Sequence, residues 1–575
     1  MRRIGSLLFL LLAPLSRAQT DELTKEAFLS PPKPIADIIL APRHLNVSLG
    51  NPSPDRGRFL VAESGGLPSI ALLAKPYVNL GGERFDIEAD RDRALNFRSS
   101  VGLRTFDWRA GKWQDIQIPS GARVSGLAWS PDGKWIAFFA HFKDGSSIWI
   151  ADAASGKSRQ LTRRRALLTL AANIEWVDGG RALMAVLVPE RRMPRPTATP
   201  EPTQPLVRFT EKVANKQRTY RGLLQDTFSQ SEFEYYTTGQ LALIEAPSGR
   251  VRNIGGPTMI RAFDPAPDGK FVRVTSVLKP FSYLVPAESF GTKEELWDES
   301  GKVLTELDKR ELRFGEQPPA KPDARRSLSW RPDGAGLSFL QQVAPPAKPE
   351  PGGGEQDGQR GGRGAGGAGQ AGPQRKDRVM LWSPPFGKDD AKVVYENDTR
   401  INSVRYSPDG QTLIFELLGD LYTLPIGGGE ATRITNGQAY DMQPAFSPDG
   451  RRIVFISDRD GAENIWTANA DGSEPRAVTT TERENYMSPV WTPDGDYVIA
   501  AKGAQLWMYH RDGGSGVQMT GVTSGPPAAP GAGGAQPPAI LGPAFGPDPD
   551  TLWVNVRGSV RGGLGARRVL DNGDE

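Results

Sequence analysis

Few residues in this chain have the types and spacing that catalysis needs. Histidine occurs three times, as His44, His141 and His510, and these positions lie far apart in the sequence. A serine hydrolase needs a nucleophile on a sharp turn, a histidine base and an orienting carboxylate. No Gly-x-Ser-x-Gly is present, and the nearest run, Gly513-Gly-Ser-Gly516, continues with Val517 between two strand-like segments. We interpret this run as a hairpin turn and predict no catalytic residues.

Metal and cofactor sites are equally hard to assemble. The chain has no cysteine and no His-x-His or His-Glu-x-x-His pair, so we predict no zinc site, no other metal site and no cofactor. Asp458-Arg-Asp-Gly461 resembles part of a calcium loop but lacks the other spaced ligands, so we interpret it as a turn. Gly427-Gly-Gly429 precedes no helix and is also interpreted as a turn, not as a phosphate-binding loop. Paired carboxylates for glycoside hydrolysis stay open, because nothing in the sequence selects a pair.

A short repeat organises the chain. Each copy has an apolar segment, an aromatic residue, a small residue, Pro-Asp-Gly and a second apolar run. Proline presets φ for the first corner of a turn, aspartate caps the turn, and glycine adopts the left-handed conformation. Each copy therefore predicts a β-hairpin. The clear copies contain Pro131-Asp-Gly133, Pro408-Asp-Gly410, Pro448-Asp-Gly450 and Pro493-Asp-Gly495, and weaker ones contain Pro54-Asp55, Trp176-Val-Asp-Gly-Gly180, Pro267-Asp-Gly269, Pro332-Asp-Gly334 and Pro547-Asp548.

The spacing of the copies predicts the fold class. Asp409, Asp449 and Asp494 lie about 40–50 residues apart, which is the length of a four-stranded propeller blade. Eight or nine copies suit an all-β propeller of seven or eight blades in one ring. Two smaller propellers are the alternative, and an irregular array of β-sandwiches is a third interpretation.

The N-terminus has the pattern of a signal peptide. Arg2 and Arg3 give a positive start, residues 4–15 are apolar, and small residues lead up to Ala18. We predict that residues 1–18 are removed near Ala18 and that the protein is periplasmic or secreted. An uncleaved membrane anchor is the alternative, although the apolar run is shorter than the roughly 20 residues of a span. After cleavage we expect no integral membrane segment.

Composition divides the remaining chain. Residues 344–375 are rich in Pro and then Gly with almost no apolar content, so we expect a disordered, solvated loop between blades. Within it, Gln359-Arg-Gly-Gly-Arg-Gly364 resembles RNA-binding tracts, but the predicted export and a net charge of only +3 over 575 residues argue against nucleic acid. We expect propeller segments at 19–343 and 376–560, and a flexible tail at 561–575.

The first propeller segment carries strings that are more specific than the repeat. They include Pro31-Pro-Lys-Pro-Ile-Ala-Asp-Ile38, Leu67-Pro-Ser-Ile-Ala-Leu-Leu-Ala-Lys-Pro76, Arg218-Thr-Tyr-Arg-Gly-Leu-Leu-Gln-Asp226 and Lys279-Pro-Phe-Ser-Tyr-Leu-Val-Pro286. Over about residues 30–340 the chain resembles the N-terminal β-propeller of the glutamyl endopeptidase branch of prolyl oligopeptidase-type serine peptidases.

The second propeller segment resembles a different family. Its strings include Leu417-Leu-Gly-Asp-Leu-Tyr-Thr-Leu-Pro-Ile426 and Gly428-Gly-Glu-Ala-Thr-Arg-Ile-Thr435. Over about residues 395–555 the chain resembles TolB-like (PD40, WD40-like) propeller repeats, as found before amidohydrolase domains.

Both resemblances imply a propeller beside a separate catalytic domain; in the peptidases the propeller caps the active site and filters substrates by size. Neither catalytic domain is recognisable before the sequence stops at Glu575. We therefore predict an exported, non-catalytic propeller that binds peptides, protein partners or cell-envelope components. The alternative is a truncated or split serine peptidase whose propeller gates a hydrolase domain not present in this chain.

Overall fold

The structure is a computed structural model. It describes residues 53–54, 58–63, 65, 68–107, 110–197, 220–314, 323–343, 376–387, 389–481, 484–503 and 505–519, and the backbone of 539–545, 551–557 and 563–568. The predicted signal peptide, His44 and the Gly-rich segment 344–375 lie outside the described residues.

Among the described residues, seven antiparallel sheets have four strands each, and every sheet takes its strands in chain order from one edge to the other. The first three comprise β7 (Arg123–Trp129), β8 (Trp135–His141), β9 (Ser146–Asp152) and β10 (Ser158–Gln160); β11 (Glu175–Val177), β12 (Ala182–Leu187), β13 (Gln240–Glu245) and β14 (Val251–Asn253); and β15 (Ile260–Pro265), β16 (Phe271–Val277), β17 (Thr292–Asp298) and β18 (Val303–Arg310). The next two comprise β19 (Arg326–Trp330), β20 (Leu337–Gln342), β21 (Asp377–Trp382) and β22 (Ala391–Asn397); and β23 (Asn402–Tyr406), β24 (Thr412–Leu417), β25 (Asp420–Pro425) and β26 (Thr432–Arg433). The last two comprise β27 (Asp441–Phe446), β28 (Arg452–Ser457), β29 (Asn464–Asn469) and β30 (Arg476–Ala477); and β31 (Tyr486–Trp491), β32 (Tyr497–Lys502), β33 (Gln505–His510) and β34 (Val517–Gln518).

Three-stranded sheets stand before and after these seven. The earlier one contains β1 (Arg58–Glu63), β5 (Gly102–Asp107) and β6 (Lys112–Asp115), and the later one contains β35 (Ala539–Phe545), β36 (Thr551–Arg557) and β37 (Gly563–Arg568). Strand β37 falls within the segment that we expected to be a flexible tail. Its backbone pairs along its length with β36.

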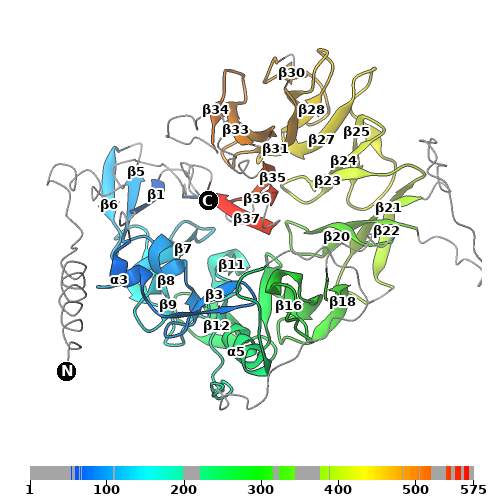
Figure 1. The fold of residues 1–575 in the computed structure, drawn as a ribbon. Coiled ribbons are helices and arrows are strands. Elements are labelled where there is room, and N and C mark those ends of the chain that lie inside the picture. Colours follow the sequence, from blue (N-terminus) through cyan, green and yellow to red (C-terminus); the bar gives the residue numbers. More distant parts are fainter. Residues whose placement is uncertain are drawn as a thin grey trace, which may run out of the picture.

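The sheets are arranged as propeller blades. Figure 1 shows them succeeding one another in chain order around a common centre. The first strand of one sheet packs against the first strand of the next, as β23 does against β27, β27 against β31 and β31 against β35. We call the first strands of the seven four-stranded sheets, β7, β11, β15, β19, β23, β27 and β31, the inner strands. The predicted all-β propeller with four-stranded blades is confirmed.

Pro-Asp-Gly turns, or Asp-Gly-Gly after β11, join each inner strand to the second strand of its blade. In one of them the hydroxyl of Ser447 donates to Asp449 Oδ1 (2.6 Å), and the backbone N–H of Arg451 donates to the same oxygen (3.1 Å). Gly450 adopts a φ of +71°, which a residue with a side chain resists. A Cβ on Gly450 would lie 3.4 Å from Pro408 Cδ in the turn of the preceding blade. Turns of adjacent blades therefore pack against each other.

Apolar clusters between consecutive sheets make up the core. On β24, Leu413 and Phe415 pack toward the preceding sheet, whereas Ile414 packs toward the following one. Successive strand residues point to opposite faces, so a strand covered on both sides must be apolar throughout. This explains why the runs after Pro-Asp-Gly are nearly continuous in apolar residues, as in β28, where only the first of six residues is not buried.

The chain leaves one blade at β20 and returns to the same blade at β21. These two strands pair from Leu337 with Trp382 to Gln342 with Asp377. Residues 344–375 therefore connect two strands of a single blade. We had expected them to join two blades. The hydrophobic pattern could not show this, because each flanking strand is too short to specify its partner.

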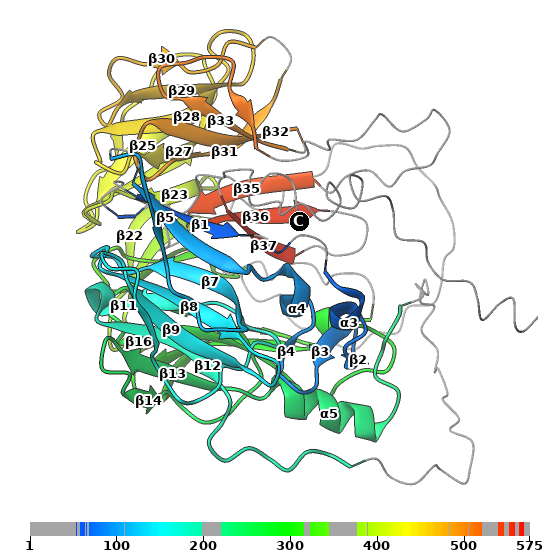
Figure 2. The same cartoon turned by 90° about the vertical axis from the view of Figure 1, so that its left-hand side faces the viewer.

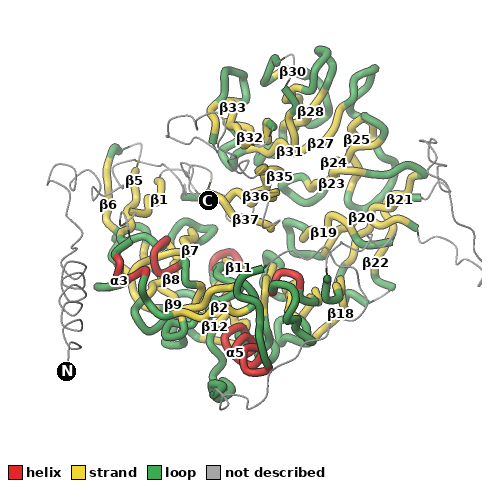
Figure 3. Tube along the Cα trace, viewed as in Figure 1, coloured by secondary structure: helices red, strands yellow, loops and turns green. Residues whose placement is uncertain are grey.

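A small additional unit lies on one side of the sheets and was not anticipated from the repeat. It contains the sheet of β2 (Tyr77–Leu80), β3 (Glu83–Asp86) and β4 (Arg91–Asp92) with α3 (Ile70–Leu73), α4 (Leu95–Arg98) and α5 (Thr227–Thr237). Figure 2 shows these elements together, and Figure 3 shows helix confined to a few places in a chain of strands and loops. The helix α5 begins at Asp226, whose carboxylate accepts from the backbone N–H of Ser229 in a capping box. Its Phe233 and Tyr236 join an aromatic cluster with Phe85 of β3.

Buried carboxylates stabilise this unit and fasten it to the blades. The carboxylate of Asp86 is fully buried and lies 2.7 Å from Lys75 Nζ and 3.7 Å from Arg91 Nη2. Asp90 accepts from Arg192 (2.8 Å) and Arg165 (3.2 Å). The Asp86 pairs join residues within the unit, whereas the Asp90 pairs fasten it to segments that are distant in the sequence.

Candidate functional site

The runs that could imitate catalytic or metal-binding motifs are turns. Residues 513–516 lie between β33 and β34, which pair antiparallel, and residues 427–429 lie between β25 and β26. Asp458 to Gly461 join β28 to β29, and the Gly461 N–H donates to the Asp458 carbonyl. The three turn predictions are confirmed. Within the part of the chain that the structure describes, no group of three or more His, Asp or Glu residues could hold a metal ion.

The structure brings His141 next to two serines, which the sequence analysis missed. His141 Nε2 lies 2.7 Å from Ser125 Oγ, and Nδ1 lies 2.8 Å from Ser146 Oγ. The usable signal was the hairpin register, since Arg123 pairs with His141 and Ser125 lies two residues further along the same strand.

This Ser-His contact is unsuited to base catalysis. Desolvation, assisted by the charges of Arg91 and Arg123, lowers the pKa of His141 from 6.5 to about 3. An imidazole with so low a proton affinity is a weak general base at neutral pH. The hydroxyl of Ser146, where a triad would place a carboxylate, accepts instead from Arg91 Nη1 (3.3 Å). His141 therefore links hydrogen bonds within the blade, whereas His510 is exposed at the end of β33.

Five inner strands, β7, β19, β23, β27 and β31, carry a β-bulge close to the turn. On these five strands the residue five positions before the turn proline adopts a left-handed conformation, and the pairing register shifts beside it. Such conformations are unfavourable for residues with side chains by about 1–3 kcal/mol, so the surrounding structure must impose them. Bulges redirect the strand and its side chains. The non-glycine examples are Ser327 (φ 53°), Ser403 (φ 53°), Gln443 (φ 55°) and Ser488 (φ 52°).

Polar residues occupy one repeat position on three consecutive inner strands. Asp264 on β15, Ser329 on β19 and Arg405 on β23 each stand three residues before the turn proline. The same position holds Ala128, Ala445 and Val490 in other blades. We call Asp264, Ser327, Ser329, Ser403 and Arg405 the inner polar surface. For Asp264 and Arg405 the signal was present in the sequence, as departures from a repeat position that is otherwise apolar or small.

The two charged members are accessible to water and yet enclosed by protein. Arg405 is exposed, but desolvation lowers its pKa, and no ion-pair partner for it occurs among the described residues. The Asp264 side chain is 46% exposed, and burial nonetheless raises its pKa against the opposing charge of Arg273, which lies 2.9 Å away. Both side chains are thus reached by solvent, although neighbouring protein atoms still reduce their hydration.

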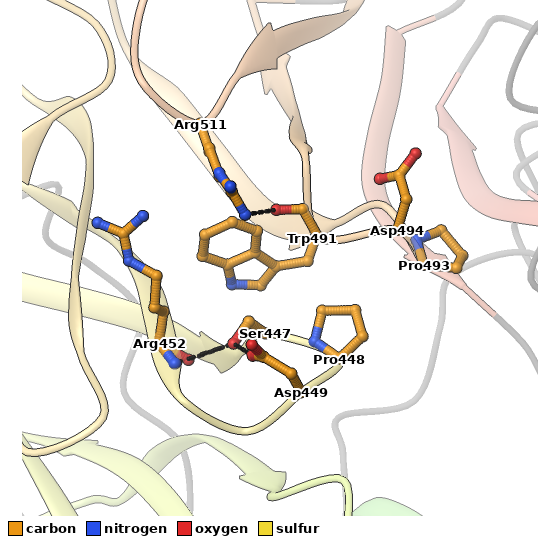
Figure 4. Close-up of a pocket in the computed structure, with 9 residues that line it drawn as sticks. Ser447, Pro448, Asp449, Arg452, Trp491, Pro493, Asp494 and Arg511 are labelled. Carbon is orange, nitrogen blue, oxygen red and sulfur yellow. Dashed lines mark hydrogen bonds between the residues drawn. The ribbon is translucent and has the colours of Figure 1, made fainter.

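A pocket of about 230 Å³ lies between the turns of two adjacent blades (Figure 4). It is smaller than the 300–1,000 Å³ typical of drug-sized ligand sites and so suits a single side chain or small group. The buried indole of Trp491 forms one wall, and its Nε1 donates to the Ala445 carbonyl (3.2 Å). The lining residues are Ser447, Pro448, Asp449, Arg452, Trp491, Pro493, Asp494, Gly495 and Arg511.

The charged residues of this pocket differ in how many hydrogen bonds and ion pairs they already make within the protein. Asp449 Oδ1 accepts from Ser447 Oγ, which together with the Arg451 N–H lowers the pKa of this carboxyl. Asp494 accepts from Thr492 Oγ1 and from the Asp496 N–H. The Arg452 guanidinium, by contrast, has no ion-pair partner among the described residues.

Comparison with known proteins agrees with this architecture. The fold and its repeats define a β-propeller, and the TolB β-propeller (PD40) family model matches residues 386–526. The chain is homologous to the N-terminal region of glutamyl endopeptidases. It is 33% identical over 319 residues to a probable chloroplastic glutamyl endopeptidase of Oryza sativa, covering 53% of this chain and 33% of the relative.

Further matches cover other shares of the chain. The Arabidopsis thaliana probable glutamyl endopeptidase is 29% identical over 337 residues, covering 56% of this chain and 34% of the relative. The Tol-Pal system protein TolB of Francisella tularensis is 30% identical over 189 residues, covering 23% of this chain and 43% of that protein. A solved prolyl endopeptidase structure is 11% identical with a TM-score of 0.34, covering 87% of this chain and 60% of that one. The chain thus spans about a third of the length of the curated peptidases that it matches.

Both expected resemblances, to the peptidase propeller and to TolB-like repeats, are confirmed. No helix among the described residues is long and apolar enough to cross a membrane.

Proposed function

We propose that this chain is a binding module that holds peptides or protein partners on its inner polar surface. The supporting observation is that inner strands of the propeller carry two charged side chains, Asp264 and Arg405, that solvent can reach. Ligand sites are concave and use a few placed polar groups for orientation. A carboxylate, a guanidinium and serine hydroxyls match the amide groups and charged side chains of a peptide, and a net charge of +3 over 575 residues gives no field for nucleic acid.

Binding of three fluorescein-labelled heptapeptides, one acidic, one basic and one neutral, tests the proposal by fluorescence anisotropy. At least one should bind, and Arg405→Ala or Asp264→Asn should weaken it about tenfold, the effect of losing one hydrogen bond to a charged group. Arg250→Ala is the control, because Arg250 is 78% exposed in a turn between outer strands. Absence of binding by all three peptides, or equal binding by all variants, would contradict the proposal.

We further propose that the protein acts outside the cytoplasm as a periplasmic or secreted protein. The support is the N-terminal pattern of Arg2, Arg3 and the apolar run that ends before Ala18. Fractionation of the source cells followed by N-terminal sequencing tests this. We expect the protein outside the cytoplasm with its N-terminus near residue 19, and a cytoplasmic protein that retains Met1 would refute export.

A second candidate function is gating of a peptidase domain. Its support is the homology to glutamyl endopeptidases that are about three times as long as the matched segment. Intact mass of the protein isolated from its own cells separates the two candidates. A mass at or just below 62.5 kDa favours the binding module. A mass larger by a domain of roughly 100–200 residues or more favours the gate, and hydrolysis of glutamyl peptide substrates should then be assayed.

A further inference from the structure

The pocket beside Trp491 lies where the turns at 447–450 and 492–495 meet. We infer that this pocket binds the carboxylate of an acidic side chain on a peptide partner, with the guanidinium groups of Arg452 and Arg511 holding the charge. The inference deepens the proposed peptide-binding function and rests on it.

The first argument is the arrangement of charge. Figure 4 shows the guanidinium groups of Arg452 and Arg511 beside the indole, whereas the carboxylate of Asp494 points away from it and that of Asp449 turns back to Ser447. The side of the pocket next to the indole is therefore cationic, although the lining contains equal numbers of arginines and aspartates.

The second argument is the number of unused donors. A guanidinium has five N–H donors. Arg511 uses one nitrogen for the Gly495 carbonyl (3.2 Å), and its ion pair with Asp496, at 3.5 Å, joins two half-exposed side chains. The side chain of Arg452 is half-buried, and its guanidinium makes no hydrogen bond or ion pair within the described residues. Arginine and carboxylate pair in a planar, charge-assisted geometry, which makes a carboxylate the matching ligand.

The third argument is the shape and the apolar wall. A volume of about 230 Å³ admits a side chain and several water molecules. The indole of Trp491 and the rings of Pro448 and Pro493 offer apolar surface to the methylene groups that carry a glutamate carboxylate. Because the pocket lies between two turns and has exposed residues at its rim, a side chain from an extended peptide can enter it without unfolding of either blade.

One arginine of this pocket stands at a repeat position that holds other residues elsewhere. The position of Arg452, two residues after the turn glycine, holds Trp135, Phe271, Thr412 and Tyr497 in other blades. Arg452 is therefore a departure from the repeat that the hairpin itself does not require. Its neighbour Arg451 is exposed and does not line the pocket, which makes it a matched control.

Fluorescence anisotropy with an amidated, fluorescein-labelled heptapeptide, Gly-Gly-Glu-Glu-Glu-Gly-Gly, tests the inference on the full chain. Matched peptides carry Gln or Lys in place of the three Glu residues. We expect the Glu peptide to bind at least tenfold more tightly than the Gln peptide, and Arg452→Gln and Arg511→Gln each to weaken it about tenfold, because each removes a charge-assisted hydrogen bond. Arg451→Gln should bind the Glu peptide like the unmodified protein.

Three outcomes would overturn the inference in distinguishable ways. Equal binding of the Glu peptide by Arg452→Gln, Arg511→Gln and the unmodified protein would refute the assignment of the carboxylate to this pocket. If Arg405→Ala alone then weakened binding of the peptide, the proposed function would still stand. Preferential binding of the Lys peptide would assign the pocket to cations through Asp449 and Asp494. Failure of all three peptides to bind would overturn both proposals. Circular dichroism of each variant ensures that only folded proteins are compared.

Discussion

The indole Nε1 of Trp176 donates a hydrogen bond to the backbone carbonyl of Ala128, 3.1 Å away in the preceding blade. Trp176 lies just before the turn of its own repeat. Ala128 lies one residue before Trp129, the aromatic residue of the preceding repeat. The same relationship occurs at two further blades, so in each of these blades the indole fastens the blade to its predecessor. The other examples are Trp330 with Asp264 (3.2 Å) and Trp491 with Ala445 (3.2 Å).

Replacing this indole should loosen the contact between blades. Trp176→Phe leaves the Ala128 carbonyl without its donor, and an unsatisfied buried acceptor costs about 1–3 kcal/mol. We expect the free energy of unfolding, measured by urea denaturation, to fall by about that amount. Trp113→Phe, at a side chain that is 45% exposed, should change it by less than about 0.5 kcal/mol. Equal effects of the two substitutions would show that the hydrogen bond is unimportant.

The turn glycines should not tolerate a side chain. Gly410 has a φ of +69°, and a Cβ there would lie 3.3 Å from Pro332 Cδ in the neighbouring turn. Gly410→Ala should lower the free energy of unfolding by about 1–2 kcal/mol, the cost of a left-handed residue with a Cβ. The matched control is Gly427→Ala, where no heavy atom lies within 4 Å of the added Cβ. A Gly410 variant as stable as the control would mean that the turns do not pack as described.

Acid should destabilise the protein partly through His141. Burial lowers its pKa from 6.5 to about 3, so between these values the unfolded chain binds a proton that the folded chain does not. This contribution to stability is complete above pH 6.5 and is lost progressively as the pH falls toward 3. Urea denaturation at pH 7.5 and pH 4.5 should show a smaller acid-induced loss for His141→Gln than for the unmodified protein, by about 2–3 kcal/mol at most. His510→Gln, at an exposed position, should keep the full loss; identical profiles for all three proteins would contradict the assignment.

The buried carboxylate of Asp86 should be essential for the stability of the small sheet. Asp86→Asn removes the charge that faces Lys75 and Arg91, and Arg91 remains only 4% exposed. Removing one partner of a buried pair costs about 3–5 kcal/mol. Glu88→Gln is the control, because Glu88 lies 3.5 Å from the same lysine but is 48% exposed, and an exposed pair contributes at most about 1 kcal/mol. Similar urea midpoints for the two variants would refute the role given to Asp86.

The hairpins and the fold class could be predicted from the sequence because they depend on neighbouring residues. In the turn at 447–450, Ser447, Asp449 and Gly450 lie within four positions of one another, and their hydrogen bonds close within the same segment. The second strand of each blade is also evident from a continuous apolar run, as in β28. Repetition of this unit at blade length then specifies a propeller.

The additional unit around α5 could not be predicted in the same way. Its aromatic cluster joins Phe85 to Phe233, and Arg192 reaches Asp90 from about 100 positions away. Nothing in the local pattern of either partner indicates the other, because these contacts depend on the path of the chain between blades.

The sequence by itself determined where the turns form, which strands are buried on both faces, and that Asp264 and Arg405 interrupt an otherwise small or apolar repeat position. The tertiary structure alone decided that Arg452 and Arg511 lie beside the same indole and that His141 contacts Ser125 and Ser146. The physical reason is that turn formation is governed by the conformational preferences of adjacent residues, whereas a pocket between blades depends on the twist and stacking of separate sheets, to which every residue in their shared core contributes.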